Sequence, residues 1–320
     1  MYSSMVATHP VVLVPLELLS EIFLFHKGSE NPENWLLSLI RICHSRRRVA
    51  FSTPKLWVHL CLLIKTPRRV IPPAAAWLRR FKFLGHTRSK NGADLLNAWL
   101  RRAGPHKTTV CIGSETRRAP DGVVRGLLGV SSNIVSLALN LSSPEYFALS
   151  RLPPGLFPSL EELTLCSDGT EDWYRPVLTF ADTPALRSLS LLGNHEFDPY
   201  DIQRLFSVPW QQLTCLIVRH FFSPRGVAFV LGKCRALQRC TIDDVTPGCD
   251  RTADVPPPPL VIAVFPAMQR FDARFVDADP GREDGGTTCL PGFQRLSFPA
   301  LRRRVRAAFP PLHGLCRAVV

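Results

Sequence analysis

The sequence lacks the paired motifs by which many catalytic and metal-binding sites are recognised. None of its ten cysteines forms a Cys-x-x-Cys pair, and none of its nine histidines forms a His-x-x-x-His pair. Zinc sites of either spacing are therefore not expected. The serine nucleophile motif Gly-x-Ser-x-Gly is also missing. We predict a protein that is not an enzyme and that uses no metal or cofactor.

Long apolar runs are missing as well. The longest, Leu56 to Ile64, contains His59 and is shorter than the roughly 18 residues that a membrane helix needs. No basic segment precedes the run Val11 to Val14, and Pro15 ends that run. We therefore expect no membrane partner, and reduced thiols in an intracellular protein of the cytoplasm, the nucleus or both.

Acidic residues are scarce relative to basic ones. Lys and Arg number 39 against 26 Asp and Glu, which gives a formal charge of +13. This charge permits binding to nucleic acid, but no recognition motif accompanies it, so nucleic acid is not the expected partner. Residues 301–320 include Arg302, Arg303, Arg304 and Arg306 and are expected to form a basic, solvated tail, with a nuclear-targeting or nucleic-acid patch as the alternative.

The N-terminal part of the chain carries two helical patterns. Pro15 is suited to the first turn of a helix, and Glu17 and Glu21 suit its N-terminal half. The apolar residues of this helix recur on one face, at Leu18, Leu19, Ile22 and Phe23. A second helix is predicted over 35–43 from the same spacing. Pro54 ends any preceding helix, because the residue before a proline disfavours the helical region.

These residues resemble an F-box, in the form common in large basidiomycete families. The resemblance covers about a seventh of the chain. The matching residues are Pro15, Glu17, Leu18, Leu19, Glu21, Ile22, Phe23, Cys43, Arg47, Val49, Ala50, Ser52, Thr53, Pro54, Leu56 and Trp57. Two positions depart from the pattern, since Val14 replaces a leucine and Arg46 replaces a tryptophan.

The resemblance implies that the helices dock on a Skp-type adaptor, which links the protein to cullin. The residues expected at this contact are Pro15, Leu18, Leu19, Ile22, Phe23, Pro54, Leu56 and Trp57. Some of them must instead face the core of the helical module, and the sequence does not separate the two sets.

From Asn133 the chain repeats. Seven segments share the pattern apolar-x-x-apolar-x-apolar, and they begin at Ile134, Leu160, Leu186, Leu213, Leu237, Met268 and Phe293. The steps between them are 26, 26, 27, 24, 31 and 25 residues. Leucine-rich repeats recur every ~20–29 residues. The longer step contains Pro256 to Pro259, which indicates a loop insertion. We predict an irregular solenoid with one strand and one short helix per repeat.

The predicted fold is α/β, with a small helical F-box module followed by this leucine-rich-repeat-like solenoid. The predicted divisions are a disordered lead at 1–12, the module at 13–62, a linker or insertion with a helix at 63–105, the solenoid at 106–300 and the tail at 301–320. A target protein would bind the strand face, at the positions between apolar residues. The candidates are Glu161, Thr164, Arg187, Ser190, Thr214 and Arg239.

Together these features predict the substrate-receptor subunit of a Skp–cullin ubiquitin ligase. Ubiquitin transfer itself would then take place on partner enzymes. The alternative is a repeat scaffold with a degenerate F-box and no ligase role, which the arginine at position 46 keeps open.

Overall fold

The computed structural model describes residues 14–26, 36, 40–41, 44–64, 92–114, 126–129, 131–141, 146, 148–167, 177–193, 202–203, 206–219, 224–245 and 267–275. Three predictions lie outside these residues: the lead at 1–12, the seventh repeat and the tail at 301–320. Residues 65–91 of the predicted linker also lie outside them.

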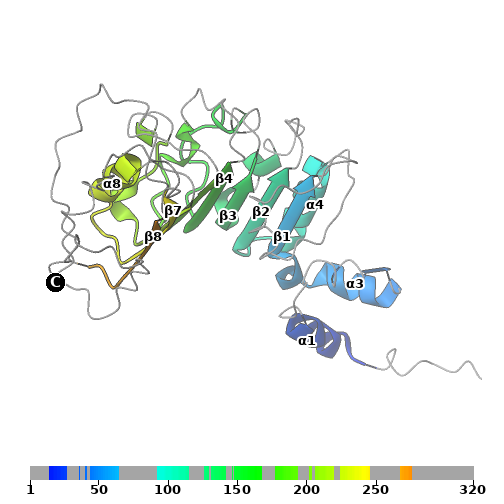
Figure 1. Cartoon of the computed structure of the whole chain (residues 1–320). Helices are drawn as coiled ribbons and strands as arrows, with labels where there is room; N and C mark the ends of the chain where they lie inside the picture. The colour runs from blue at the N-terminus through cyan, green and yellow to red at the C-terminus, as the bar shows by residue number, and fades with distance from the viewer. Residues whose placement is uncertain are drawn as a thin grey trace, which may run out of the picture.

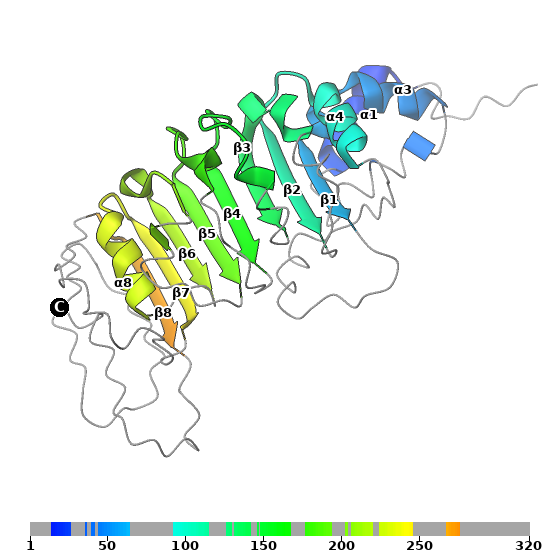
Figure 2. The same cartoon turned by 90° about the horizontal axis from the view of Figure 1, so that it is seen from above.

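The described residues form an α/β structure built on an open sheet of eight parallel strands. Each strand pairs with the strand next to it in the chain, from β1 at one edge to β8 at the other (Figures 1 and 2). The strands are β1 His59–Ile64, β2 Thr108–Ser114, β3 Ile134–Asn140, β4 Glu162–Ser167, β5 Ser188–Gly193, β6 Cys215–Arg219, β7 Arg239–Val245 and β8 Arg270–Phe275. The α/β prediction is confirmed.

Helices and short 3-10 turns occupy the connections. They are α1 Leu16–His26, α3 His44–Ser52, η2 Pro54–Trp57, α4 Gly92–Ala103, η4 Leu127–Gly129, η5 Ser131–Asn133, η6 Leu178–Phe180, η7 Trp210–Gln212 and α8 Pro224–Lys233. In Figure 2, α1, α3 and α4 lie at the β1 end of the row and α8 lies at the β8 end. Of the predicted helix at 35–43, Leu36, Ile40 and Arg41 are described; all are helical and Leu36 is buried.

Each of the first five repeats contributes three apolar residues to one core. In the third repeat, Leu189 and Leu191 point into the core from β5, while Ser188 and Ser190, which alternate with them, are half-buried on the other face. Leu186 is also buried, but it lies in the turn before the strand. From β4 onward, the strands therefore begin two residues after the first apolar position of the repeat. Burying a leucine contributes roughly 1.5–3 kcal/mol, so the repeated pattern is the main stabilising feature of the sheet.

The sheet begins earlier than the predicted repeat region. β1 follows η2 at once and pairs in parallel with β2, from His59 opposite Thr109 to Ile64 opposite Ser114. β1 forms the first edge of the sheet.

The helical end and the sheet share a continuous core. The ring of Trp57 in η2 meets the edge of Trp99 in α4, with ring centroids 4.7 Å apart. The indole Nε1 of Trp57 donates a hydrogen bond to the carbonyl oxygen of Ala50 at 2.8 Å. The guanidinium of Arg102 lies over the rings of Phe51 and Trp57, at 4.7 and 4.9 Å from their centroids. These contacts join α3 and η2 to α4, which also packs against β1 and η4.

Candidate functional site

The predicted adaptor-contact residues of α1 fall on two sides of the helix. Leu19 and Phe23 are 6% and 4% exposed and belong to the core. Leu18 and Ile22 are 56% and 46% exposed, and Phe25 is 84% exposed. Positions 18, 22 and 25 are spaced by four and three residues, so these side chains form one stripe on the helix surface. The helix therefore has a buried apolar side and an exposed apolar side.

The predicted contact residues outside the stripe of α1 are mostly buried or half-buried. Leu56 and Trp57 are buried, Pro54 is half-buried and Pro15 is exposed. Leu19, Phe23, Leu56 and Trp57 are buried in the core cluster and stabilise the helical end itself, and their contact with a partner stays a prediction. Phe25, which was not among the predicted residues, joins the exposed set; the i, i+4, i+7 spacing from Leu18 would have identified it.

Arg46, at the position where the resembling family has tryptophan, is half-buried in α3. The next residue supports the local fold, because the Nε of Arg47 donates a hydrogen bond to the carbonyl oxygen of Ile40 at 2.8 Å. This bond ties α3 to the segment that contains Ile40.

The predicted target-contact residues lie in neighbouring rows across the sheet. Thr164 of β4 and Ser190 of β5 are direct register partners, and both are half-buried. Glu161, Arg187 and Thr214 lie just before three successive strands. The amide of Arg187 donates to the carbonyl of Glu161 at 2.9 Å, and the amide of Thr214 donates to the carbonyl of Arg187 at 2.8 Å. The backbone ladder therefore brings these three residues together.

Arg239 lies further along the sheet, in β7, where its register partner is Arg270 of β8. Both arginines are exposed. Arg270 was not among the predicted residues. It occupies the third position of its repeat, as Arg239 does, and aligning the looser sixth repeat with the fifth would have identified it.

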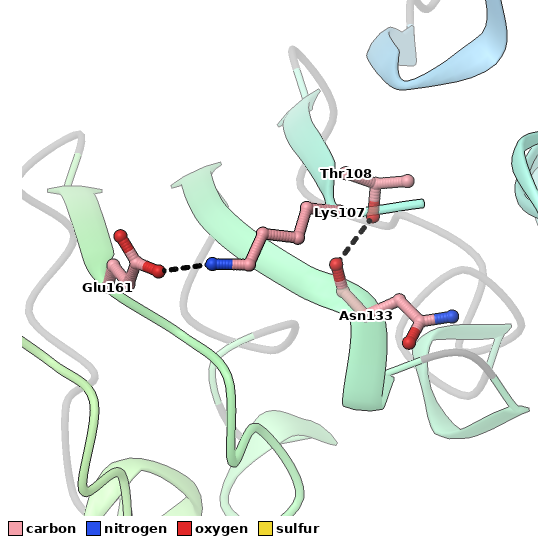
Figure 3. Close-up of polar contacts among 4 residues, drawn as sticks. All are labelled: Lys107, Thr108, Asn133 and Glu161. Carbon is pink, nitrogen blue, oxygen red and sulfur yellow. Dashed lines mark hydrogen bonds and ion pairs between the residues drawn. The ribbon is translucent and has the colours of Figure 1, made fainter. Parts of the chain in front are cut away.

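One of the predicted residues, Glu161, takes part in an ion pair. The Nζ of Lys107 lies 2.8 Å from Oε1 of Glu161, and Figure 3 shows the lysine side chain reaching across β3 to make this contact. In the same view Thr108 Oγ1 donates a hydrogen bond to the carbonyl oxygen of Asn133 at 3.3 Å. Exposed pairs of this kind contribute about 0–1 kcal/mol each, so they orient side chains more than they stabilise the fold.

At the other end of the sheet, two more ion pairs are present. Arg219 of β6 pairs with Asp243 of β7 at 2.8 Å, and Arg270 pairs with Asp272 two residues later at 2.6 Å. The sheet surface consequently carries charges of both signs at both ends.

Two thiols at the α8 end are enclosed by apolar neighbours. Burial raises the pKa of the Cys234 thiol to about 12, and burial together with nearby Cys234, Cys215 and Asp272 raises the pKa of Cys240. Both thiols stay protonated at neutral pH and pack as small apolar groups. Within the described ranges, no three or more His, Cys, Asp or Glu side chains gather as a metal site.

No helix among the described residues combines the length and the apolar character that a bilayer crossing requires. No protein-family model matches the chain, and no curated protein matches it.

Proposed function

We propose that the protein is the substrate-receptor subunit of a Skp–cullin ubiquitin ligase. In this proposal the N-terminal helices are an F-box that docks on a Skp-type adaptor. The sheet is the strand face of an irregular leucine-rich-repeat solenoid, which binds a target protein.

The observation that carries the proposal is the exposed apolar stripe of α1, formed by Leu18, Ile22 and Phe25. The same helix already buries Leu19 and Phe23 against its own module. A short helix with a second apolar side in solvent is suited to packing against partner helices. Two residues of the stripe, Leu18 and Ile22, are among those that resemble the F-box, and this favours the adaptor as the partner.

The sheet supports the second half of the proposal. Its strands are parallel, pair in chain order and recur with the period of the repeats. The half-buried and exposed positions between the core leucines, such as Thr164, Ser190 and Arg239, lie on one surface. Strand surfaces of stacked repeats are extended and are suited to binding proteins.

Co-expression with a Skp-type adaptor, followed by size-exclusion chromatography, tests the adaptor contact. We expect the wild-type chain to co-elute with the adaptor. The double variant Leu18→Asp, Ile22→Asp should stay folded but fail to co-elute, because it places two charges in the exposed stripe and leaves the buried side of α1 unchanged.

Leu178→Asp is the matched control. Leu178 lies in η6, far along the chain from α1, and its side chain is 46% exposed, as is that of Ile22. This variant should bind the adaptor as the wild type does. A folded wild-type chain that does not bind the adaptor would overturn the proposal and favour the scaffold without a ligase role.

A further inference from the structure

Two arginines lie opposite each other at the β8 end of the sheet. Arg239 of β7 and Arg270 of β8 are direct register partners, and both are exposed. Their strands lie roughly 4.8 Å apart, and like charges that face each other across neighbouring strands repel. An anion that contacts both guanidinium groups relieves this repulsion.

The charges of the two arginines are only partly balanced. The Nε of Arg270 lies 2.6 Å from Oδ2 of Asp272, and the side chain of Arg270 remains 70% exposed. Arg239 forms no ion pair with a residue of the described ranges. The next carboxylate along β7, that of Asp243, is paired with Arg219. Among the described residues, two guanidinium groups therefore share one carboxylate.

The register row that contains the arginines also holds an exposed carboxylate. The row runs from Glu162 of β4 through Ser188 and Cys215 to Arg239. Three strand spacings amount to ~14 Å, which exceeds the Debye length of about 8 Å at physiological ionic strength. Glu162 therefore does not neutralise the arginines, and the row presents charges of opposite sign at two separate places.

We propose that Arg239 and Arg270 bind an acidic segment of the target protein, which lies extended across β7 and β8. This inference rests on the proposed function, because it names what the strand face recognises. Side chains on one side of an extended segment recur every ~6.6–6.8 Å, a spacing that two long arginine side chains on neighbouring strands reach. The exposed Gln269, just before Arg270, adds an amide that can hydrogen-bond to the backbone of the segment.

Nucleic acid fits this surface less well. Proteins that bind single strands stack the bases on aromatic side chains, and the row from Glu162 to Arg270 contains no aromatic residue. A polyanion that runs along the row would also meet the carboxylate of Glu162. A short acidic segment covers the two arginines alone.

Fluorescence anisotropy of a labelled peptide of alternating glutamate and serine, titrated with the full-length chain, tests the site. Arg239→Gln should weaken binding about fivefold, since an exposed charge contact makes a difference of this order. The double variant Arg239→Gln, Arg270→Gln should weaken it by more than about tenfold. Asp272→Asn should instead tighten binding by about threefold, because it releases the guanidinium of Arg270 from its ion pair.

Arg101→Gln is the matched control. Arg101 is exposed on α4, at the β1 end of the row of strands (Figure 2), so this variant removes the same charge far from β7 and β8. It should bind the peptide as the wild type does. Equal binding by the wild type and the arginine double variant would overturn the proposal. So would displacement of the peptide by single-stranded oligothymidine at a lower concentration than by the unlabelled peptide.

The peptide titration needs no adaptor, so it is independent of the co-elution experiment. The arginine double variant should still co-elute with the adaptor, because the exposed stripe of α1 is unchanged. Peptide binding without adaptor binding would overturn the ligase role and leave the acidic-segment site standing. Adaptor binding by a wild-type chain that does not bind the peptide would overturn the acidic-segment site alone.

Discussion

At the scale of single residues, the indole nitrogens of Trp57 and Trp99 differ in their hydrogen bonding. Trp57 donates to Ala50, whereas the buried Nε1 of Trp99 has no hydrogen-bond partner in the described part of the chain. A lost hydrogen bond costs about 1 kcal/mol, and removing an unsatisfied donor recovers a comparable amount. We expect Trp57→Phe to lower the free energy of unfolding by roughly 1–3 kcal/mol more than Trp99→Phe, measured by urea unfolding. Equal losses would contradict this assignment of the two nitrogens.

The buried thiol of Cys234 makes a second residue-scale prediction. Its pKa is raised from 9.0 to about 12, so the folded chain keeps a proton that the unfolded chain loses between these values. Above about pH 9 the unfolded state therefore binds fewer protons, and stability falls as pH rises. The slope contributed by this thiol approaches ~1.4 kcal/mol per pH unit. Urea unfolding from pH 8 to pH 10.5 should show a shallower decline for Cys234→Ala than for the wild type.

Val230→Ala is the control for this measurement. Val230 is buried on the same helix α8 and carries no titratable group. Its truncation should lower stability at every pH by a constant amount and leave the slope unchanged. The thiol assignment fails if Cys234→Ala behaves in the same way.

At the scale of elements, two glycines near helix ends should respond oppositely to alanine. Gly104 follows α4 in the left-handed region, with φ 61°, and its amide donates to the carbonyl of Leu100 at 3.2 Å. An alanine there is strained by about 1 kcal/mol although no described atom lies within 4 Å of its Cβ. Gly232 lies inside α8 with no positive φ and the same open space.

Gly232→Ala should therefore stabilise the chain by roughly 0.5 kcal/mol, since alanine is the better helix former. Gly104→Ala should destabilise it, and the two variants can be compared by thermal unfolding of the full chain. Stabilisation by both substitutions would mean that the left-handed turn does not end α4.

At the scale of the whole molecule, the helical end and the sheet should unfold together. Leu19 of α1, Trp99 of α4 and Leu137 of β3 belong to one continuous core cluster. Leu19→Ala removes buried side-chain volume from that cluster, which typically costs about 2–5 kcal/mol. We expect one transition, shifted as a whole to lower urea concentration when followed by far-ultraviolet circular dichroism. A separate early step, with the main transition unmoved, would show that the helical end has a core of its own.

Much of the element order could be predicted from the sequence. The alternation of leucines located β3 to β8 within about two residues, because the buried positions of a strand recur with period two. α8 begins at Pro224, a residue suited to the first turn of a helix, and its buried residues Val227, Val230 and Leu231 follow the helical period. The offset of two residues arose because the first apolar residue of a repeat is buried in a turn, which hydrophobicity alone does not distinguish from a strand.

The candidate site was predicted less completely. Periodicity placed Leu18, Leu19, Ile22 and Phe23 on one helix, but a helix with apolar residues around half its circumference has no unique inner side. The neighbouring η2 and α3 decided that Leu19 and Phe23 turn inward, and that Leu18 and Ile22 remain in solvent with Phe25.

The sequence by itself determined the period of the strands, the apolar composition of the core and the location of α1, since these depend on local spacing. The tertiary structure alone decided which residues become neighbours across strands. The partners Cys61 and Cys111 are 50 residues apart in the chain, and Arg239 and Arg270 are 31 apart. Register depends on where each strand begins within its repeat and on the lengths of the connections, and neither is encoded in the pattern of a single repeat.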